Sequence, residues 1–132
     1  IQALVVKSSA PQPRRVTNGL DSSRVNMLLA VLERRAGLRL GEHDVYVSTV
    51  GGVKITEPAA DLAIALAVAS AIQDKPIAHN LVAYGEISLA GEVRKVSNDK
   101  ARASEASRLG FVRTVDSKVG DLRAALALAL NW

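Results

Sequence analysis

A chain of 132 residues, with 48% hydrophobic and 23% charged residues, has the size and composition of one globular domain that buries a real core. The absence of cysteine excludes a disulfide framework and a thiolate metal site, and it fits a reducing cytoplasm. The net charge of +4 allows the binding of polyanions wherever cations cluster, whereas 3% aromatic residues exclude a base-stacking platform for single strands.

Two histidines and one long apolar run bear on metal and membrane binding. His43 and His79 form no cluster with ligand spacing, so we expect no zinc site. The apolar run at residues 62–72 is shorter than the roughly 20 residues that cross a bilayer. We therefore expect a soluble, cytoplasmic protein without a membrane partner.

The first third of the chain predicts two extended segments and a helix. Apolar and β-branched residues predict a strand at Ile1–Lys7, and serine and proline residues predict a loop over 8–13. After a short extended segment at 14–16, Asp21 is a good N-cap for a helix whose apolar residues recur at helical spacing until Gly37. Because the chain starts within a strand pattern and without methionine, we expect a domain cut from a longer polypeptide.

The middle of the chain contains an alternating segment and the most apolar helix. Alternation predicts a strand at 44–50, followed by a turn or bulge at Gly51-Gly52 and an extended continuation over 53–55. Pro58 suits a first helical turn, and nearly every position from 60 to 72 is apolar or small. This helix is therefore predicted to be buried on most of its circumference.

The last part of the chain predicts short strands and two more helices. The strands are expected at 81–84 and 112–115, a hairpin at 87–95, and the helices at 99–109 and 120–131. Ser97 or Asn98 is expected to cap the first of these helices, which Gly110 ends. Together the elements predict one α+β domain over residues 1–132 with mixed sheet pairing.

The segment Glu57-Pro58-Ala59-Ala60-Asp61 opens the apolar helix, and the hairpin at 85–93 and the helix around 100–106 follow later in the chain, at spacings that match a known family without gaps. In this order, the three segments resemble the proteolytic domain of Lon. The resemblance implies the α+β fold of that domain, of the ribosomal protein S5 domain 2-like class, with a mixed sheet and packed helices. In its register, Ala59 stands at the position of the nucleophilic serine and Arg102 at that of the catalytic lysine.

Neither of these side chains can perform the chemistry of a serine–lysine dyad. The methyl group of Ala59 cannot attack a carbonyl, and the dyad needs a neutral lysine that accepts the hydroxyl proton. The guanidinium of Arg102 stays protonated, so it can bind an anion but cannot act as a general base. We therefore expect no catalytic residue, with Ala59 and Arg102 as a degenerate dyad.

A narrower resemblance covers almost the whole chain. Its residues are Pro13-Arg14-Arg15-Val16, Gly19-Leu20-Asp21, Asn26, the run 28–37, Gly51-Gly52-Val53 and the run 57–63. They resemble the C-terminal Lon-like domain of the RadA (Sms) family of bacterial DNA repair and recombination proteins, which lacks the peptidase dyad. That family couples the domain to a zinc finger and a RecA-like ATPase, assembles as a hexameric ring, and acts as a DNA-dependent ATPase and branch-migration helicase.

This second resemblance implies cofactors and partners for the whole protein. ATP, magnesium and zinc are expected only in the N-terminal modules, and no cofactor is expected in the domain itself. The implied partners are single-stranded or branched DNA, further copies in a hexameric ring, and a recombinase filament. The implied function is a catalytically inactive scaffold whose non-specific DNA binding supports ATP-driven branch migration in homologous recombination.

Five cations are candidate contacts for DNA phosphates: Arg14, Arg15, Arg24, Lys54 and Arg102. Adjacent arginines in a loop, with another in the first turn of the next helix, can converge on one face, and phosphate contacts need no base-specific geometry. The alternative is a solvated surface, or an ion pair such as that of Arg24 with a carboxylate of a neighbouring subunit. In the Lon-like arrangement the former active site opens toward the ring interior, where Lys54 and Arg102 extend the same surface.

The sequence leaves two other classes of function open. One is a peptidase that uses a different hydroxyl, such as Ser97, Thr49 or Ser70. Ser97 begins a Ser-x-x-Lys pattern, but this pattern is short and a serine before a helix is more often a cap. The other class is a pure oligomerisation module without DNA contacts. A P-loop is excluded, because the chain has no Gly-x-x-x-x-Gly-Lys-Ser/Thr pattern.

Overall fold

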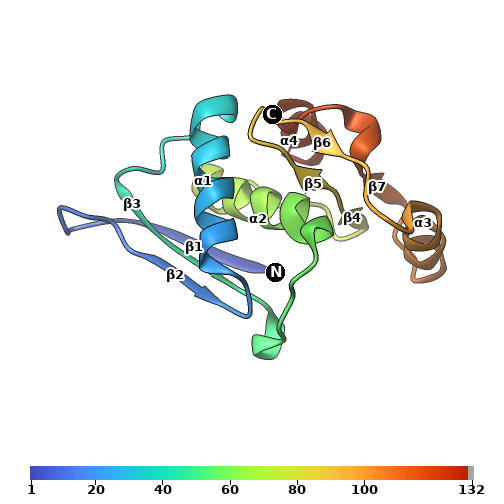
Figure 1. The fold of residues 1–132 in the computed structure, drawn as a ribbon, viewed down its shortest axis with the longest axis horizontal. Coiled ribbons are helices and arrows are strands. Elements are labelled where there is room, and N and C mark those ends of the chain that lie inside the picture. Colours follow the sequence, from blue (N-terminus) through green and yellow to red (C-terminus); the bar gives the residue numbers. More distant parts are fainter. Residues whose placement is uncertain (131–132) are drawn as a thin grey trace.

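The computed structural model describes residues 1–130, without the side chain of Asp99. In chain order, the strands and α-helices are β1 (Gln2–Lys7), β2 (Arg15–Asn18), α1 (Ser22–Ala36), β3 (His43–Ser48), α2 (Asp61–Gln73), β4 (Leu81–Ala83), β5 (Glu86–Ile87), β6 (Val93–Arg94), α3 (Asp99–Arg108), β7 (Arg113–Val115) and α4 (Leu122–Leu130). Short 3₁₀ turns lie at Val50–Gly52, Pro58–Ala60 and Ser117–Val119. Along the longest axis, strands β1 to β3 lie at one end and α3 at the other, with α2 between them (Figure 1).

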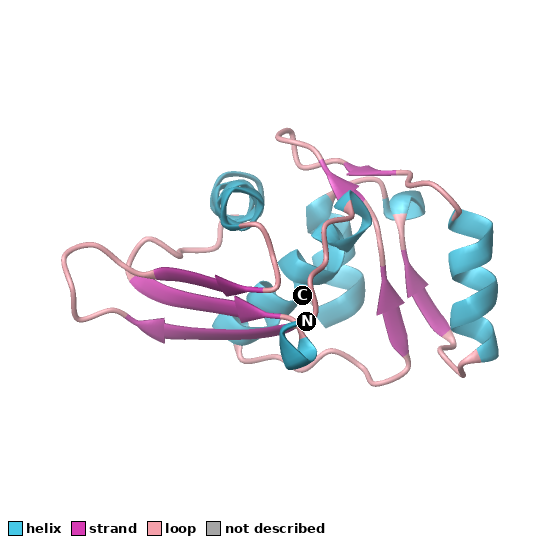
Figure 2. Cartoon of the chain, turned by 60° about the horizontal axis from the view of Figure 1, so that its bottom comes forward, coloured by secondary structure: helices cyan, strands magenta, loops and turns pink. Residues whose placement is uncertain are grey.

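The strands form three separate small sheets. In the first, β3 is central and pairs antiparallel with β1 and parallel with β2. β4 pairs in parallel with β7, and β5 pairs with β6 as an antiparallel hairpin. The predicted mixed pairing is confirmed in the first sheet, but one sheet does not run through the domain. Helix α2 contacts β1 as well as β4 and β5, so it separates the sheets (Figure 2).

Helix α2 forms the centre of the core. It contacts β1, α1 and α4, and Leu62, Ala65, Leu66 and Val68 are each at most 1% exposed. The predicted burial of this helix is therefore confirmed, and its small side chains allow neighbours to approach from several directions. Within the part of the chain that the structure describes, no helix combines the length and hydrophobicity needed to span a bilayer.

Both ends of α1 follow the local sequence signals. The side chain of Asp21 accepts a hydrogen bond from the backbone N–H of Ser23, which makes it the predicted N-cap. Gly37 adopts φ 72° just after the helix, and its N–H donates to the carbonyl of Glu33. A left-handed residue at this position favours glycine, so the predicted end of the helix is confirmed.

The extended segment predicted over 53–55 does not continue the strand into a sheet, although Val53 itself is extended. Gly51 and Gly52 both have positive φ in the 3₁₀ turn, which carries the chain out of the sheet after β3. The backbone N–H of Ile55 then donates to the carbonyl of Gly19 at 2.9 Å instead of joining a strand. The segment from 53 to 57 is therefore a loop, and the hydrogen bond to Gly19 is one of the contacts that hold it.

The two predicted C-terminal helices are present with shifted ends. Asn98 takes the N-cap position of α3 with φ 62°, but its side chain makes no capping hydrogen bond. Helix α4 begins at Leu122, because Gly120 with φ 90° ends a 3₁₀ turn before it. The predicted end of this helix at Asn131 lies outside the described residues.

Candidate functional site

The two positions that were predicted to form a degenerate dyad line one cavity. Ala59 lies in the 3₁₀ turn before α2, Arg102 lies in α3, and the cavity between them has a volume of about 300 Å³. We call it the Ala59–Arg102 pocket; its other walls are Glu57, Pro58, Glu86, Lys95, Val96, Ser97 and Asn98. Ala59 and Arg102, which the sequence related only through the Lon-like register, are thus neighbours in space.

Backbone hydrogen bonds hold the Ala59 turn against the β5–β6 hairpin. The N–H of Gly85 donates to the carbonyl of Ala59 at 2.9 Å, and the N–H of Leu62 donates to the carbonyl of Gly85 at 3.1 Å. A Cβ on Gly85 would lie 2.7 Å from Cγ1 of Val93, so this close approach requires glycine. The turn and the hairpin therefore form one unit in which Ala59 is 6% exposed.

The guanidinium of Arg102 has two acceptors within the chain. Its Nη2 donates to Oε2 of Glu57 at 2.8 Å, and its Nε donates to the carbonyl of Ser97 at 3.1 Å. These contacts fix a permanent cation beside the methyl group of Ala59. The pocket can therefore attract an anion, but Arg102 cannot accept a proton in it.

The hydroxyls of the peptidase alternative lie in different surroundings. Thr49 is 4% exposed and donates to the carbonyl of Val53, which closes the turn after β3. Ser70 donates to the carbonyl of Lys75 at the end of α2. Ser97 lines the Ala59–Arg102 pocket and is therefore the one of these three hydroxyls that an acyl group could reach there.

Restoring the hydroxyl at position 59 alone should not create a peptidase. In Ala59→Ser, the nearest basic group of the former dyad is Arg102, which cannot take the hydroxyl proton. We expect fluorogenic peptides and unfolded protein to be cleaved no faster by this variant than by the unmodified protein. The control is Ser97→Ala, which should be equally inactive. Measurable turnover in the Ala59→Ser variant would show that the dyad assignment is mistaken.

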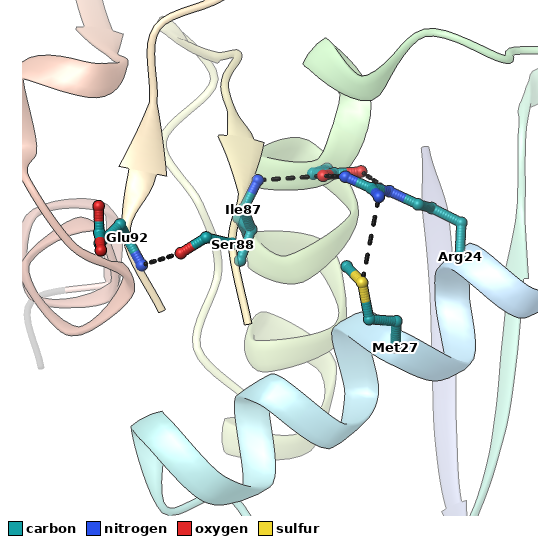
Figure 3. A network of polar contacts seen from close by, with 6 residues as sticks. Arg24, Met27, Ile87, Ser88 and Glu92 are labelled. Atoms are coloured by element: carbon teal, nitrogen blue, oxygen red, sulfur yellow. Dashed lines mark hydrogen bonds and ion pairs between the residues drawn. The ribbon is translucent and has the colours of Figure 1, made fainter. Parts of the chain in front are cut away.

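Arg24 forms a buried ion pair with Asp61 that sequence reasoning did not find. Its Nε donates to Oδ1 of Asp61 at 2.9 Å, and its Nη2 donates to Oδ2 (Figure 3). The backbone N–H of Ile87 donates to the same Oδ2 at 3.0 Å. The Asp61 side chain is 2% exposed and that of Arg24 is 34% exposed. The pair therefore ties α1, α2 and β5 together at one buried carboxylate.

The ion pair also uses two of the five N–H donors of Arg24. The hydrogen bond to Asp61, helped by the charge of that carboxylate, raises the pKa of Arg24 against the opposing effect of burial. The remaining terminal nitrogen, Nη1, contacts the sulfur of Met27 at 4.0 Å. The predicted alternative of an ion pair is thus realised, with a carboxylate of the same chain. The available signal was one acidic residue in the first turn of an otherwise apolar helix.

Arg14 and Arg15 lie at the start of β2 and differ in their contacts. The side chain of Arg14 is exposed, while its backbone N–H donates to Oδ1 of Asp44 at 2.7 Å. That hydrogen bond is the main reason why the pKa of Asp44 is lowered. The guanidinium of Arg15 donates to the carbonyls of Leu40, at 2.9 Å, and His43. Arg14 is therefore the more available cation, and Arg15 stabilises the chain before β3.

The five candidate cations are spread along the length of the domain. The strand that begins with Arg15 and the helix that carries Arg102 lie at opposite ends of the longest axis (Figures 1 and 2). Arg24 and Arg102 line two different cavities, and Glu57 lines both. Lys54 is exposed in the loop that leads to Glu57. DNA contact by each of the five stays a prediction.

Comparison with known families and proteins identifies the evolutionary group of the chain. A family model described as subunit ChlI of Mg-chelatase matches residues 22–118, from the start of α1 to the last 3₁₀ turn. The chain belongs to this ChlI family. The ChlI match includes the Ala59–Arg102 pocket and the Arg24–Asp61 pair.

The ChlI-family chain is also similar to curated bacterial proteins. It is 50% identical over 115 residues to the DNA repair protein RadA of Escherichia coli (strain K12), which is 87% of this chain and 25% of that protein. Over 122 residues it is 48% identical to the DNA repair protein RadA of Rickettsia bellii, covering 92% of this chain and 27% of that protein. The chain therefore spans about a quarter of the length of these relatives.

Among the described residues, no three His, Asp or Glu side chains are placed to hold a metal ion.

Proposed function

We propose that this ChlI-family domain is a catalytically silent, Lon-like scaffold of a RadA-type DNA repair protein. The domain supports a hexameric ring of subunits and binds DNA phosphates without reading sequence. The observation that carries the proposal is the 50% identity to a protein named DNA repair protein RadA over 87% of the chain. ATP, magnesium and zinc then belong to other modules of the protein, and the ring serves branch migration in homologous recombination beside a recombinase filament.

The geometry of the Ala59–Arg102 pocket supports the absence of peptidase chemistry. The former nucleophile and base positions face one cavity, yet they present a methyl group and a guanidinium. A guanidinium beside a methyl group is unreactive toward a peptide bond but attractive to an anion. This combination favours a binding role over an enzymatic one.

The net charge of the chain and the exposure of Arg14 support contact with the DNA backbone. The chain carries a net charge of +4, and Arg14 is exposed. The nearby carboxylate of Asp44 already accepts a hydrogen bond from the backbone N–H of Arg14. Cationic side chains on a rigid strand can position a phosphate without reading bases. Binding of this type weakens with salt, because each neutralised phosphate releases condensed counterions.

Replacing Arg14 with alanine tests this proposal in the protein at its natural length. We expect Arg14→Ala to lower the affinity for single-stranded DNA and to flatten the plot of log K against log salt. The slope should fall by about 0.7 for each subunit whose Arg14 contacts a single-strand phosphate. The measurement is a fluorescence-anisotropy titration of a labelled oligonucleotide at several salt concentrations.

The control for Arg14→Ala is Arg123→Ala, which removes an exposed charge from α4. The two variants lose the same charge, so only a local contact of Arg14 separates their affinities. Arg15 is a poorer probe, because Arg15→Ala also removes the hydrogen bonds to Leu40 and His43. If both variants bind with the salt dependence of the unmodified protein, Arg14 makes no phosphate contact and the oligomerisation-module interpretation gains support.

A further inference from the structure

We infer that the Ala59–Arg102 pocket binds a phosphate group, and that the carboxylate of Glu57 competes with this phosphate for Arg102. The inference rests on the proposed function, in which Arg102 contacts DNA, and it adds the site, its ligand chemistry and an internal competitor. It starts from the contact between Nη2 of Arg102 and Oε2 of Glu57, at 2.8 Å.

The walls of the pocket carry the donors that a phosphate needs. Arg102 is 30% exposed and contributes a planar fork, and Lys95, an exposed residue, also lines the pocket. Ser97 and Asn98 add a hydroxyl and an amide beside these two cations. Arginine recognises phosphate and carboxylate oxygens with the same geometry, so a group that satisfies Glu57 also satisfies a phosphate.

Glu57 is placed to leave Arg102 at little cost. Its side chain is 67% exposed, and the structure shows one ion pair for it, with Arg102. Exposed pairs of this kind are weak, because water solvates both partners when they separate. Glu57 also lines the neighbouring cavity beside Arg24.

Asp61, in contrast, is a carboxylate that is fixed beside its partners. It lies four residues after Glu57, is 2% exposed and accepts hydrogen bonds from Arg24 and from the backbone of Ile87. Glu57 has neither the burial nor the additional donor. The two acids beside the Ala59 turn thus differ in function: Asp61 stabilises the fold, and Glu57 is a replaceable partner of Arg102.

The charge balance of the pocket favours an incoming anion once Glu57 moves. With Glu57 in place, two cations, Lys95 and Arg102, face two acids, Glu57 and Glu86. When the carboxylate of Glu57 turns to solvent, Glu86 is the acid left among the described side chains that line the pocket. A phosphate then replaces a carboxylate of lower charge, which favours the exchange at low salt.

The test compares Glu57→Gln with Glu105→Gln in the protein at its natural length. Both changes add one positive charge, and both release an arginine, because Glu105 pairs with Arg108 on the exposed face of α3. We expect Glu57→Gln to bind a single-stranded oligonucleotide about threefold to fivefold more tightly than the unmodified protein. This is the change in affinity that corresponds to the loss of one competing, exposed ion pair. Glu105→Gln should give a smaller gain, and the gain of Glu57→Gln should disappear in an Arg102→Gln background.

Inorganic phosphate distinguishes the two sources of the ligand. Phosphate is titrated against both variants while its ³¹P resonance is observed. The ³¹P resonance can broaden more with Glu57→Gln than with Glu105→Gln while the affinity for the oligonucleotide does not rise in the same way. That result assigns the pocket to a free phosphate group. Gains for both ligands assign it to the DNA backbone.

The outcomes separate this inference from the proposed function. If the unmodified protein binds DNA but Glu57→Gln and Glu105→Gln change affinity for DNA and phosphate equally, the pocket is not a phosphate site, while the proposed DNA binding stands. If no form of the protein binds DNA, the proposed function is wrong. In that case, the assignment of the pocket as a phosphate site stands only if Glu57→Gln still binds inorganic phosphate more tightly than Glu105→Gln does.

Discussion

Arg24→Met should lower the free energy of unfolding of the domain by about 3 kcal/mol, because it removes the only side-chain partner that the structure shows for a buried carboxylate. Asp61 is 2% exposed and would keep just the backbone N–H of Ile87 as a donor. Methionine retains most of the length and apolar volume of the arginine stem, so the loss reports the unpaired charge and not a cavity. The measurement is urea denaturation followed by circular dichroism.

The control for Arg24→Met is Arg108→Met, which breaks an ion pair of the opposite kind. Arg108 and Glu105 are 68% and 55% exposed, so their separation should change the free energy of unfolding by less than about 1 kcal/mol. A second variant, Arg24→Met with Asp61→Asn, removes the buried charge but keeps an oxygen for the N–H of Ile87. It should be more stable than Arg24→Met alone.

Equal costs for Arg24→Met and Arg108→Met would contradict the structural role of the Arg24–Asp61 pair. The result also bears on DNA binding, because an arginine that holds a buried carboxylate is not free to follow a phosphate. If Arg24→Met destabilises the domain as expected, its effect on DNA affinity cannot be assigned to a lost phosphate contact. Arg14 and Arg102 are then the arginines on which the DNA interface can be tested.

Helices were predictable from the sequence where their signals are local. Asp21 and Gly37 define the ends of α1 through capping and a left-handed turn, and both act within a few residues of the helix. The burial of α2 followed from an apolar composition on all sides. The neighbourhood of Ala59 and Arg102 followed from the Lon-like register, which carries spatial information that periodicity lacks.

Contacts between distant residues were not predictable in the same way. Arg24 and Asp61 are 37 positions apart, and nothing in either local pattern names the other as its partner. The backbone carbonyls of Leu40 and His43 that accept hydrogen bonds from Arg15 have no sequence signature, since every residue carries one. The division into three sheets was also hidden, because strands of two or three residues specify pairing weakly.

Gly19→Ala should lower the free energy of unfolding by about 3 kcal/mol through two effects at one position. Gly19 has φ 81°, a conformation that costs an L-residue about 1–2 kcal/mol. A Cβ there would lie 2.5 Å from the carbonyl oxygen of Val53 and would also overlap the hydroxyl of Thr49. Such overpacking adds about 1–3 kcal/mol, because the backbone of residue 53 must move.

The matched control is Gly37→Ala, which changes a glycine of similar φ, 72°, that has no atom within 4 Å of a built Cβ. It should lose only the conformational part, about 1 kcal/mol. The difference between the variants therefore measures the close approach of Gly19 to Thr49 and Val53. This approach also fixes the loop to Glu57, because the carbonyl of Gly19 accepts the N–H of Ile55 at 2.9 Å. Equal losses in both variants would mean that the loop yields freely to a methyl group and that Gly19 does not position Lys54 and Glu57.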